Sequence, residues 1–239
     1  MTRTNGYGQP IGEDVGSFTG ASRPQSGPFR RRYCTIEHLD VSKHGQDLFE
    51  ALYAPSDDAD WTYMPYERPL DGPAFLKWLQ SNSTSTDPYW YTILDANKMA
   101  QGMFTYLRIV PEVGSTEIGH IMLGRALQRS RTATEAFYLL VREAFEGLGN
   151  RRLEWKCDSL NARSKRAADR LGFTFEGILR QCIIYKGRSR DTAWFSIIDK
   201  EWPVIKKGFE LWLSDDNFDA DGKQIKTLEV CRTEATVSN

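Results

Sequence analysis

The sequence predicts an α/β protein with one mixed central β-sheet flanked by helices. Strand-like and helix-like segments follow one another in the order β-α-α-β-β-β-α-β-α-β-β, which is typical of this class. Hydrophobic residues make up 40% of the chain and charged residues 26%, as in ordinary soluble globular proteins. The length of 239 residues fits one large domain, or a domain with extensions, and allows a core without disulfide bonds.

The N-terminal segment reads as an arm outside the folded domain. Residues 1–30 are rich in Gly, Pro and Ser and show no hydrophobic periodicity. This composition favours disorder, and an arm packed along the domain surface is the alternative. We expect the domain itself to span residues 31–213, and residues 214–239 to form a surface tail.

Regular elements begin after Arg31. An alternating segment predicts a strand, and the next segment predicts a helix with one apolar side. An aromatic-rich loop then leads to a short second helix, a polar turn and three strand-like segments. The predicted ranges are, in order, Tyr33–Leu39, Ser42–Ala54, Pro55–Asp71 for the loop, Pro73–Gln80, Tyr89–Leu94, Met99–Val110 and Thr116–Leu123.

The clearest helix of the chain follows these three strands. Its apolar residues from Ala136 to Leu148 recur at i, i+1, i+4 and i+5, and so form one stripe. Thr132 and Glu135 have the spacing of a capping box at its start, and a glycine at 147 or 149 ends it. A strand, a helix, two strands and a last helix complete the prediction: Arg152–Cys157, Ala162–Leu171, Phe173–Ile184, Thr192–Ile198 and Trp202–Leu213.

Charge and residue usage argue against several functional classes. The formal net charge is −1, without the basic excess of a nucleic-acid-binding protein. The four cysteines form no CxxC pair, and none of the three histidines has zinc-ligand spacing, so we expect free thiols and no metal. No apolar run reaches the length of a membrane span, and the N-terminus resembles no secretory signal. We therefore expect a cytoplasmic protein that does not bind membranes, with the nucleus as a second compartment.

The loop before the clearest helix is a candidate anion site. A strand ends at Leu123, and a short loop runs from Gly124 to Arg131 into the helix. A helix N-terminus presents unpaired amides and the positive end of the dipole. Two arginines beside these amides could hold a diphosphate. The alternative is an ordinary strand-to-helix turn with solvated arginines.

Several motifs in the chain occur in the order and spacing of one known family. They are Glu117-Ile-Gly-His, Leu127-Gln-Arg, Ala133-Thr-Glu-Ala, Asn161-Ala-Arg-Ser and Arg170-Leu-Gly-Phe. Over residues 30–200 the chain resembles the GNAT superfamily of acyl-CoA N-acyltransferases, and most closely the RimJ and RimL branch of ribosomal-protein N-terminal acetylases. The resemblance implies a GNAT fold, in which neighbouring strands of the mixed sheet splay apart and hold CoA in the gap.

The resemblance assigns the CoA diphosphate to the loop described above. In the family, a loop of pattern Q/R-x-x-G-x-G/A cradles the diphosphate with its backbone amides. The family glycine falls on Arg131, so close approach of the phosphates is harder unless this side chain points away. The residues expected to bind CoA are Met122, Leu123, Gln128, Arg129, Ser130, Arg131, Thr132, Ala133, Thr134, Asn161, Lys165 and Arg166.

The helix after Asn161 is expected to flank the cofactor. Asn161 in this pattern hydrogen-bonds the pantetheine arm, and Lys165 and Arg166 could reach the 3′-phosphate, unless they form a solvated basic face. Many members carry a tyrosine on this helix as general acid, but that position here is Ala168. The RimL-like pattern offers Ser164 instead, with a helix-capping hydroxyl as the alternative.

An amine must be neutral to attack a thioester, which requires a base or a water path to bulk solvent. Glu117 and His120 are the candidates, because both lie on the strand that enters the site. By alternation they should point to opposite faces of the sheet, so that only one faces the acceptor. Glu117 is preferred, because a strand carboxylate is a recurrent base in this family. The alternative for each residue is a structural hydrogen bond.

The acceptor site is expected between an N-terminal loop and a late hairpin. Trp61, Tyr63 and Tyr66 form an aromatic cluster that borders the acceptor groove in the family, although such clusters are also common in cores. Arg188 and Arg190 lie in the turn between the last two strands, where they could hold a carboxylate. A charged hairpin turn without this role is the alternative.

These observations predict an acetyl-CoA-dependent N-acetyltransferase. The expected reaction is direct transfer of acetyl to a primary amine of a small or amino-acid-like molecule, without a covalent enzyme intermediate or a metal. A protein N-terminus as the acceptor, or a CoA-binding module without turnover, are the alternatives. We expect a monomer or a homodimer.

Overall fold

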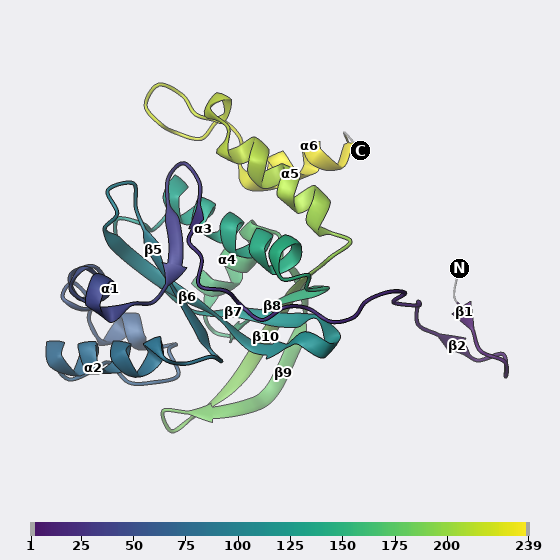
Figure 1. Cartoon of the computed structure of the whole chain (residues 1–239), viewed down its shortest axis with the longest axis horizontal. Coiled ribbons are helices and arrows are strands. Elements are labelled where there is room, and N and C mark those ends of the chain that lie inside the picture. The colour runs from purple at the N-terminus through teal and green to yellow at the C-terminus, as the bar shows by residue number, and fades with distance from the viewer. Residues whose placement is uncertain (1–2, 238–239) are drawn as a thin grey trace.

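The computed structural model describes residues 3–237 and is built on an eight-stranded sheet (Figure 1). The strand order is β3-β4-β5-β6-β7-β8-β10-β9. In that order the strands are Phe29–Arg30, Thr35–His38, Tyr89–Leu94, Ala100–Val110, Ser115–Leu123, Arg152–Asp158, Arg188–Ile198 and Thr174–Tyr185. All neighbours pair antiparallel except β7 and β8, which pair parallel, so the sheet is mixed, as predicted.

One face of the sheet is covered by the later helices of the chain. These are α3 (Arg131–Arg142), α4 (Ala162–Leu171), α5 (Trp202–Leu213) and α6 (Leu228–Val237), which pack over a large hydrophobic core (Figure 1). The apolar stripe of α3 is buried in this core. A π-helical turn, Glu143–Gly147, continues α3. We call this side the α3/α4 face.

The opposite face is covered only in part. There α1 (Val41–Leu48), its π-helical continuation Phe49–Tyr53 and α2 (Gly72–Ser83) pack over β5 and β6 around a second core. The loop between them, which contains a 3-10 turn at Asp58–Trp61, lies against the same core. We call this side the α1/α2 face.

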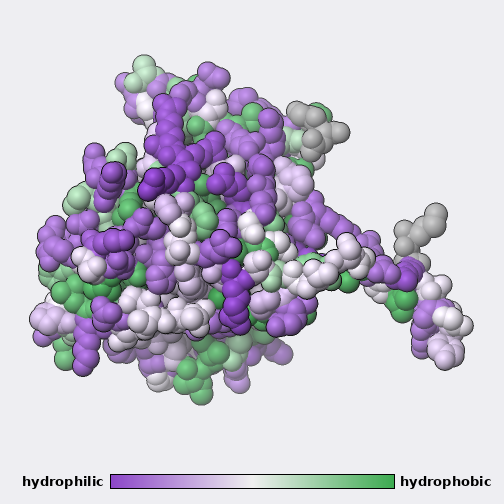
Figure 2. Space-filling view, viewed as in Figure 1, coloured by the Kyte–Doolittle hydropathy of each residue, from purple (hydrophilic) through white to green (hydrophobic). Residues whose placement is uncertain are grey.

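The N-terminal arm is ordered along part of its length. Ala21 and Ser22 donate backbone hydrogen bonds to Pro111 and Leu148 of the domain, at 2.9 and 2.7 Å. Before this anchored stretch, a small hairpin of β1 (Arg3–Thr4) and β2 (Pro10–Ile11) projects from the body, as Figures 1 and 2 show. The arm thus contacts the domain from Glu13 onward, where Glu13 pairs with Lys200.

The C-terminal segment differs from the surface tail that the sequence predicts. After a 3-10 turn at Asp215–Asn217, the chain forms helix α6. Leu228, Cys231 and Ala235 of α6 are buried and extend the core of the α3/α4 face. Because α6 packs on α5 and α4, residues 214–237 belong to the folded unit.

Candidate active site

The site is organised around a gap in the sheet between β7 and β8. The two strands pair from Ser115↔Arg152 to Ile118↔Trp155, and no pairing follows. Yet β7 continues to Leu123, and β8 continues to Asp158. The strands therefore splay apart over residues 119–123 and 156–158, as the resemblance implies. Backbone groups along both inner edges are available to a ligand.

A β-bulge at His120 starts the splayed part of β7. Opposite the two-residue step from Thr105 to Met103 on β6, β7 advances by three residues, from Gly119 to Met122. His120 has a φ of 47°, in the left-handed region that residues other than glycine rarely adopt. The extra residue shifts the alternation of every side chain that follows it.

This bulge overturns the expectation that Glu117 and His120 point to opposite faces. Ile118 and Ile121 both pack into the core of the α3/α4 face, although they are three positions apart and would point to opposite faces in a regular strand. His120 instead contacts Trp90 of the other core, with ring centroids 5.1 Å apart. Glu117 precedes Ile118, so it lies on the α1/α2 face as well. Both candidates therefore share one side of the gap.

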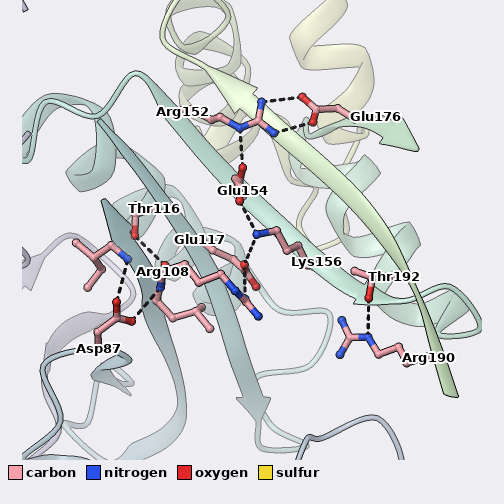
Figure 3. Close-up of polar contacts among 12 residues, drawn as sticks. Asp87, Arg108, Thr116, Glu117, Arg152, Glu154, Lys156, Glu176, Arg190 and Thr192 are labelled. Carbon is pink, nitrogen blue, oxygen red and sulfur yellow. Dashed lines mark hydrogen bonds and ion pairs between the residues drawn. The ribbon is translucent and has the colours of Figure 1, made fainter. Parts of the chain in front are cut away.

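Glu117 lies in a chain of alternating charges on the α1/α2 face (Figure 3). Its Oε2 accepts from Arg108 at 2.6 Å and from Lys156 at 3.0 Å, and the side chain is almost completely buried. Its Oε1 has no hydrogen-bond or ion-pair partner within residues 3–237. It is not among the polar atoms of these residues that are fully buried without a partner, so solvent can reach it. One oxygen is therefore fixed by two cations, and the other remains available.

Lys156 connects Glu117 to the rest of the chain of charges. Its Nζ lies 2.6 Å from Glu154 and 3.7 Å from the centre of the Trp194 ring. Arg152 donates from its Nε to Glu154 and from its two terminal nitrogens to the two carboxylate oxygens of Glu176 (Figure 3). Since Lys156 is only 7% exposed, these partners are needed to hold its charge.

His120 lies in an aromatic enclosure. Its ring stacks on Tyr66 with centroids 5.8 Å apart, and its Nδ1 lies 3.2 Å from the Tyr66 hydroxyl oxygen. Burial, aided by the positive charge of Arg108, lowers the pKa of His120 to about 4. The imidazole is therefore neutral at physiological pH.

The N-terminus of α3 lies beside the gap, but its cap differs from the predicted one. Ser130 is the N-cap, and its hydroxyl accepts from the amide of Ala133 at 3.0 Å. Glu135 instead accepts from the amides of Tyr33 and Cys34, at 2.6 and 3.0 Å. The capping box of Thr132 and Glu135 is therefore wrong, because this carboxylate serves the chain before β4.

Three amides at this helix start are available to an anion. The N–H groups of Arg129, Arg131 and Thr132 have no hydrogen-bond partner within the described part of the chain. The Arg131 side chain turns away, since its guanidinium lies over the Phe218 ring and donates to the Tyr33 hydroxyl at 3.3 Å. The arginine at the family's glycine position thus leaves the backbone approachable.

The other predicted loop residues have different surroundings. Gln128 and Arg129 are exposed, and Gln128 donates to the carbonyl of Leu123 at 3.0 Å. Ala133 and Thr134 are buried, with exposed fractions of 6% and 3%, so they contribute backbone rather than side chains. Met122 and Leu123 are half-buried on the splayed part of β7.

Helix α4 begins on the other side of the gap. Asn161 is its N-cap and accepts from the Ser164 amide at 3.0 Å, which leaves the Asn161 Nδ2 as a donor. Ser164 is therefore not the cap: its hydroxyl accepts from the Trp155 indole at 2.9 Å. Trp155 belongs to the core of the α3/α4 face, so Ser164 lies on the face opposite Glu117.

Two basic residues of α4 stand near the same opening. Lys165 is half-buried near Cys157, at the end of β8. Burial raises the pKa of the Cys157 thiol, and the positive charge of Lys165 is one of the effects that oppose this rise. Arg166 is exposed and lies one helical turn before Arg170, which donates to Thr134 of α3 at 3.2 Å. Arg166 is thus on the side of α4 that faces the start of α3.

The loop after α1 and the β9–β10 hairpin meet on the α1/α2 side. Lys186 donates to the carbonyl of Trp61 at 2.7 Å, and Arg188 to that of Thr62 at 2.9 Å. The Tyr63 hydroxyl donates to the carbonyl of Leu160 at 3.3 Å. These bonds join the loop to the hairpin and to the segment before α4.

The predicted acceptor residues separate into two groups. Trp61 is 1% exposed and is a core residue rather than a lining residue. Tyr63 is exposed, whereas Tyr66 is half-buried and its hydroxyl reaches His120. Arg190 donates from its Nε to Thr192 at 3.1 Å, its guanidinium lies over the Tyr185 ring, and its terminal nitrogens have no hydrogen-bond partner among the described residues.

Sequence reasoning missed Arg108 and Lys156. The polar alternation of Arg152, Glu154 and Lys156 along one strand is a signal that could have revealed the second. Arg108 could not be found in this way, because its φ of 48° places it at a second bulge, in β6. Asp87 holds this bulge by accepting from the amides of Arg108 and Ile109.

Other types of site are not formed by residues 3–237. They contain no group of three His, Cys, Asp or Glu residues placed to hold a metal ion. None of their helices is both long enough and apolar enough to span a bilayer. A surface hollow between the arm and the strand ends near Ser115, Arg152 and Lys200 contains none of the predicted site residues.

Comparisons with known proteins agree with this fold. A family model described as an acetyltransferase (GNAT) domain matches residues 39–174. The crystal structure of a GCN5-related N-acetyltransferase from Brucella melitensis is 40% identical to this chain, covers 92% of it and 100% of its own length, and has a TM-score of 0.88. A probable acetyltransferase of the GNAT family from Chromobacterium violaceum is 39% identical, with coverages of 81% and 97% and a TM-score of 0.75.

A more distant structure shows the fold alone. It is the microcin C7 self-immunity acetyltransferase MccE in complex with acetyl-CoA and AMP, at 19% identity, with coverages of 70% of this chain and 93% of that chain and a TM-score of 0.60. No curated protein matches the chain.

Proposed function

The chain belongs to the GNAT family of acetyltransferases, and on this premise we propose that it transfers acetyl from acetyl-CoA to a primary amine of a small, amino-acid-like molecule. One observation carries the proposal. The gap between β7 and β8 opens beside the free amides of α3, with Glu117 on one face of the sheet and Ser164 on the other.

The residues on the α3/α4 side fit acetyl-CoA. The amides of Arg129, Arg131 and Thr132 would hold the diphosphate, and Arg166 would reach the 3′-phosphate. The inner edges of residues 119–123 and 156–158 would pair with the amides of the pantetheine arm, with the Asn161 Nδ2 as a further donor. The presence of acetyl-CoA in the MccE complex supports the same donor here.

On the α1/α2 side, Glu117 would receive the proton of the acceptor amine. Its Oε1 is available, while Arg108 and Lys156 hold Oε2 in place. Either direct contact or one bridging water would bring the carboxylate to the nitrogen. The neutral amine then attacks the thioester carbonyl through the gap, and no covalent enzyme intermediate is needed.

On the opposite side, Ser164 would assist the departing sulfur. Its oxygen already accepts from the Trp155 indole, so its own hydrogen can be donated. CoA thiolate is a fair leaving group, with a thiol pKa near the ordinary value of about 8.5. The contribution of this hydroxyl to kcat is therefore small, about a hundredfold or less.

The contacts around the proposed acceptor site favour a small acceptor over a protein N-terminus. The bonds from Lys186 to Trp61, from Arg188 to Thr62 and from Tyr63 to Leu160 join the elements beside this site. A flexible polypeptide would need a more open path. The terminal nitrogens of Arg190 offer a partner for an acceptor carboxylate, as does the part of Arg188 that Thr62 does not use.

Turnover with a panel of acceptors tests the proposal. Release of free CoA thiol from acetyl-CoA is measured with amino acids, their decarboxylated amines and short peptides. Amino acids should react faster than the matching amines, and the difference should shrink in Arg188→Ala or Arg190→Ala. Equal rates for both small classes, with faster reaction of peptides, would replace the small acceptor by a peptide N-terminus. No thiol release with any acceptor would leave a CoA-binding module.

A further inference from the structure

The two ring nitrogens of His120 have different surroundings. Nδ1 lies 3.2 Å from the hydroxyl of the half-buried Tyr66. Nε2 has no hydrogen-bond partner within residues 3–237, and it is not one of their polar atoms that are sealed from solvent. One nitrogen is thus engaged, and the other faces an accessible space on the α1/α2 face.

The hydroxyl of Tyr66 determines which nitrogen carries the hydrogen. Burial raises the pKa of Tyr66 far above its ordinary value, so the phenol stays protonated. No other described residue accepts its hydrogen, so the phenol is satisfied only by donating to Nδ1 of His120. Nδ1 then acts as the acceptor, and Nε2 carries the hydrogen.

A second cationic donor stands on the same face. Arg108 uses only its Nη1 on Glu117, and 56% of its side chain is exposed. Figure 3 shows its guanidinium lying over β7 beside Glu117. Both Arg108 and His120 occupy bulges, in the neighbouring strands β6 and β7, and this local geometry presents their side chains to the α1/α2 face.

We propose that His120 is not a base but a fixed hydrogen-bond donor, which together with Arg108 binds an anionic oxygen group of the acceptor, such as a carboxylate, in addition to the contacts proposed for Arg188 and Arg190. Tyr66 is then a positioning residue, because it acts only by locking the imidazole. This inference rests on the proposed function for the identity of the ligand, whereas the donor pair itself is a property of the folded protein.

The charges around His120 are consistent with this assignment. Arg108 comes from β6, Glu117 from its own strand, and Trp90 and Tyr66 face it from β5 and the loop after α1. Glu117 is neutralised by Arg108 and Lys156 through a single oxygen. An incoming carboxylate therefore meets a donor N–H and a guanidinium with unused N–H groups.

The tautomer can be measured without any turnover. The full-length protein contains only three histidines, so long-range ¹H–¹⁵N spectra of ¹⁵N-histidine-labelled protein resolve each ring. The signal lost in His120→Gln identifies His120. We expect hydrogen on Nε2, unchanged from pH 8 to pH 5.5, and a mixture of tautomers in Tyr66→Phe. Hydrogen on Nδ1 in the wild type would overturn the proposal.

The anion site is tested with acetate as the probe, titrated against chloride at constant ionic strength. We expect a saturable shift of the His120 Nε2 signal, with His38 unaffected. The shift should be lost in Arg108→Gln and kept in Arg180→Gln, a matched control on exposed β9. Unchanged His38 and His44 signals in Arg108→Gln establish that this variant is folded. No saturable shift, or an equal shift in both variants, contradicts the assignment.

Kinetics distinguish a donor from a base. The side-chain amide of glutamine can place an N–H near the position of Nε2 but cannot take up a proton. The preference for amino acids over their decarboxylated amines should fall about tenfold in His120→Ala, and His120→Gln should restore much of it. Equal losses of kcat in both variants, with the preference intact, would show that His120 is the base.

Discussion

Glu117 combines two features that single residues rarely share in a buried site. Its Oε2 is shared by Arg108 and Lys156, while Oε1 has no protein partner among the described residues. The ion pairs compensate for the loss of water around a nearly buried carboxylate. At the same time, they fix the remaining oxygen in one direction, toward the α1/α2 side of the gap.

Replacement of Glu117 by Gln tests its role as the base. Near pH 7 few amines are neutral without help, so Glu117→Gln should lose most activity there. Above pH 9 the amine loses its proton to solvent, and activity should recover in part. Initial rates of thiol release from pH 6 to pH 10 measure this.

Glu154→Gln is the matched control, since Glu154 belongs to the same chain of charges but lies in the paired part of β8. If Glu117→Gln gives the same pH profile as the wild type, Glu117 is structural. The same result would direct the search for the base to a water chain.

The titration of His120 makes the stability of the folded protein depend on pH. Its pKa is about 4 in the folded protein, because of burial and then Arg108, against an ordinary value of about 6.5. Below the ordinary pKa of histidine, His120 is protonated in the unfolded chain but stays neutral in the folded protein. The free energy of unfolding therefore falls as the pH drops toward 4. Between pH 7.5 and pH 5 this costs about 2 kcal/mol.

Urea unfolding at several pH values measures this cost. His120→Gln has no titrating group at this position, so its free energy of unfolding should fall by about 2 kcal/mol less than that of the wild type over the same range. Parallel pH dependence in the two proteins would show that the imidazole titrates normally.

At the scale of elements, the β9–β10 hairpin is bonded to the loop after α1, beside the proposed acceptor site. Lys186 lies in its turn, is 10% exposed on its side chain, donates to Trp61 and pairs with Glu67 at 3.3 Å. Together with Arg188 it joins the hairpin to a loop more than a hundred residues earlier in the chain. The proposed acceptor site therefore depends on a contact between elements rather than on either one alone.

Lys186→Ala should loosen this contact. We expect the KM for the acceptor to rise roughly tenfold, the cost of losing one charged hydrogen bond, with the affinity for acetyl-CoA unchanged. Lys200→Ala is the matched control, because Lys200 bonds Glu13 of the arm, away from the proposed acceptor site. An equal effect of both variants on the KM would mean that the hairpin does not shape the site.

The elements themselves were predictable where periodicity is strong. The ranges for β5, α4 and α5 are confirmed residue for residue. The start of α3 was placed wrongly, because Ser130 competes with Thr132 as a cap and Glu135 bonds elsewhere. Helix α6 was missed, although Leu228, Cys231 and Ala235 have helical spacing.

At the scale of the whole molecule, the sheet separates two chemical environments. The α3/α4 face offers free amides, basic residues and Ser164, whereas the α1/α2 face offers Glu117, His120 and Arg108. Only the gap between β7 and β8 joins them. Such a division suits a reaction in which donor and acceptor approach one carbon atom from opposite sides.

Much of this arrangement could be predicted from motifs, and part of it could not. The order of motifs placed the loop before α3, Asn161 and Ser164 around one gap. The bulges at Arg108 and His120 were not predictable, since neither position carries a glycine or a turn signal. The contact between Tyr66 and His120 depends on the bulge at His120, so the sequence could not predict it either.

The central claim is that acetyl-CoA binds between β7 and β8, with its diphosphate on the start of α3. Calorimetric titration of the wild type with acetyl-CoA tests it most directly. The account predicts saturable one-to-one binding in the micromolar range, about −8 kcal/mol. Arg129→Glu should weaken it by placing a negative charge beside the diphosphate, and Arg180→Glu, the same change on distant β9, should not. Absence of measurable binding by the wild type, or equal weakening by both variants, would contradict the account.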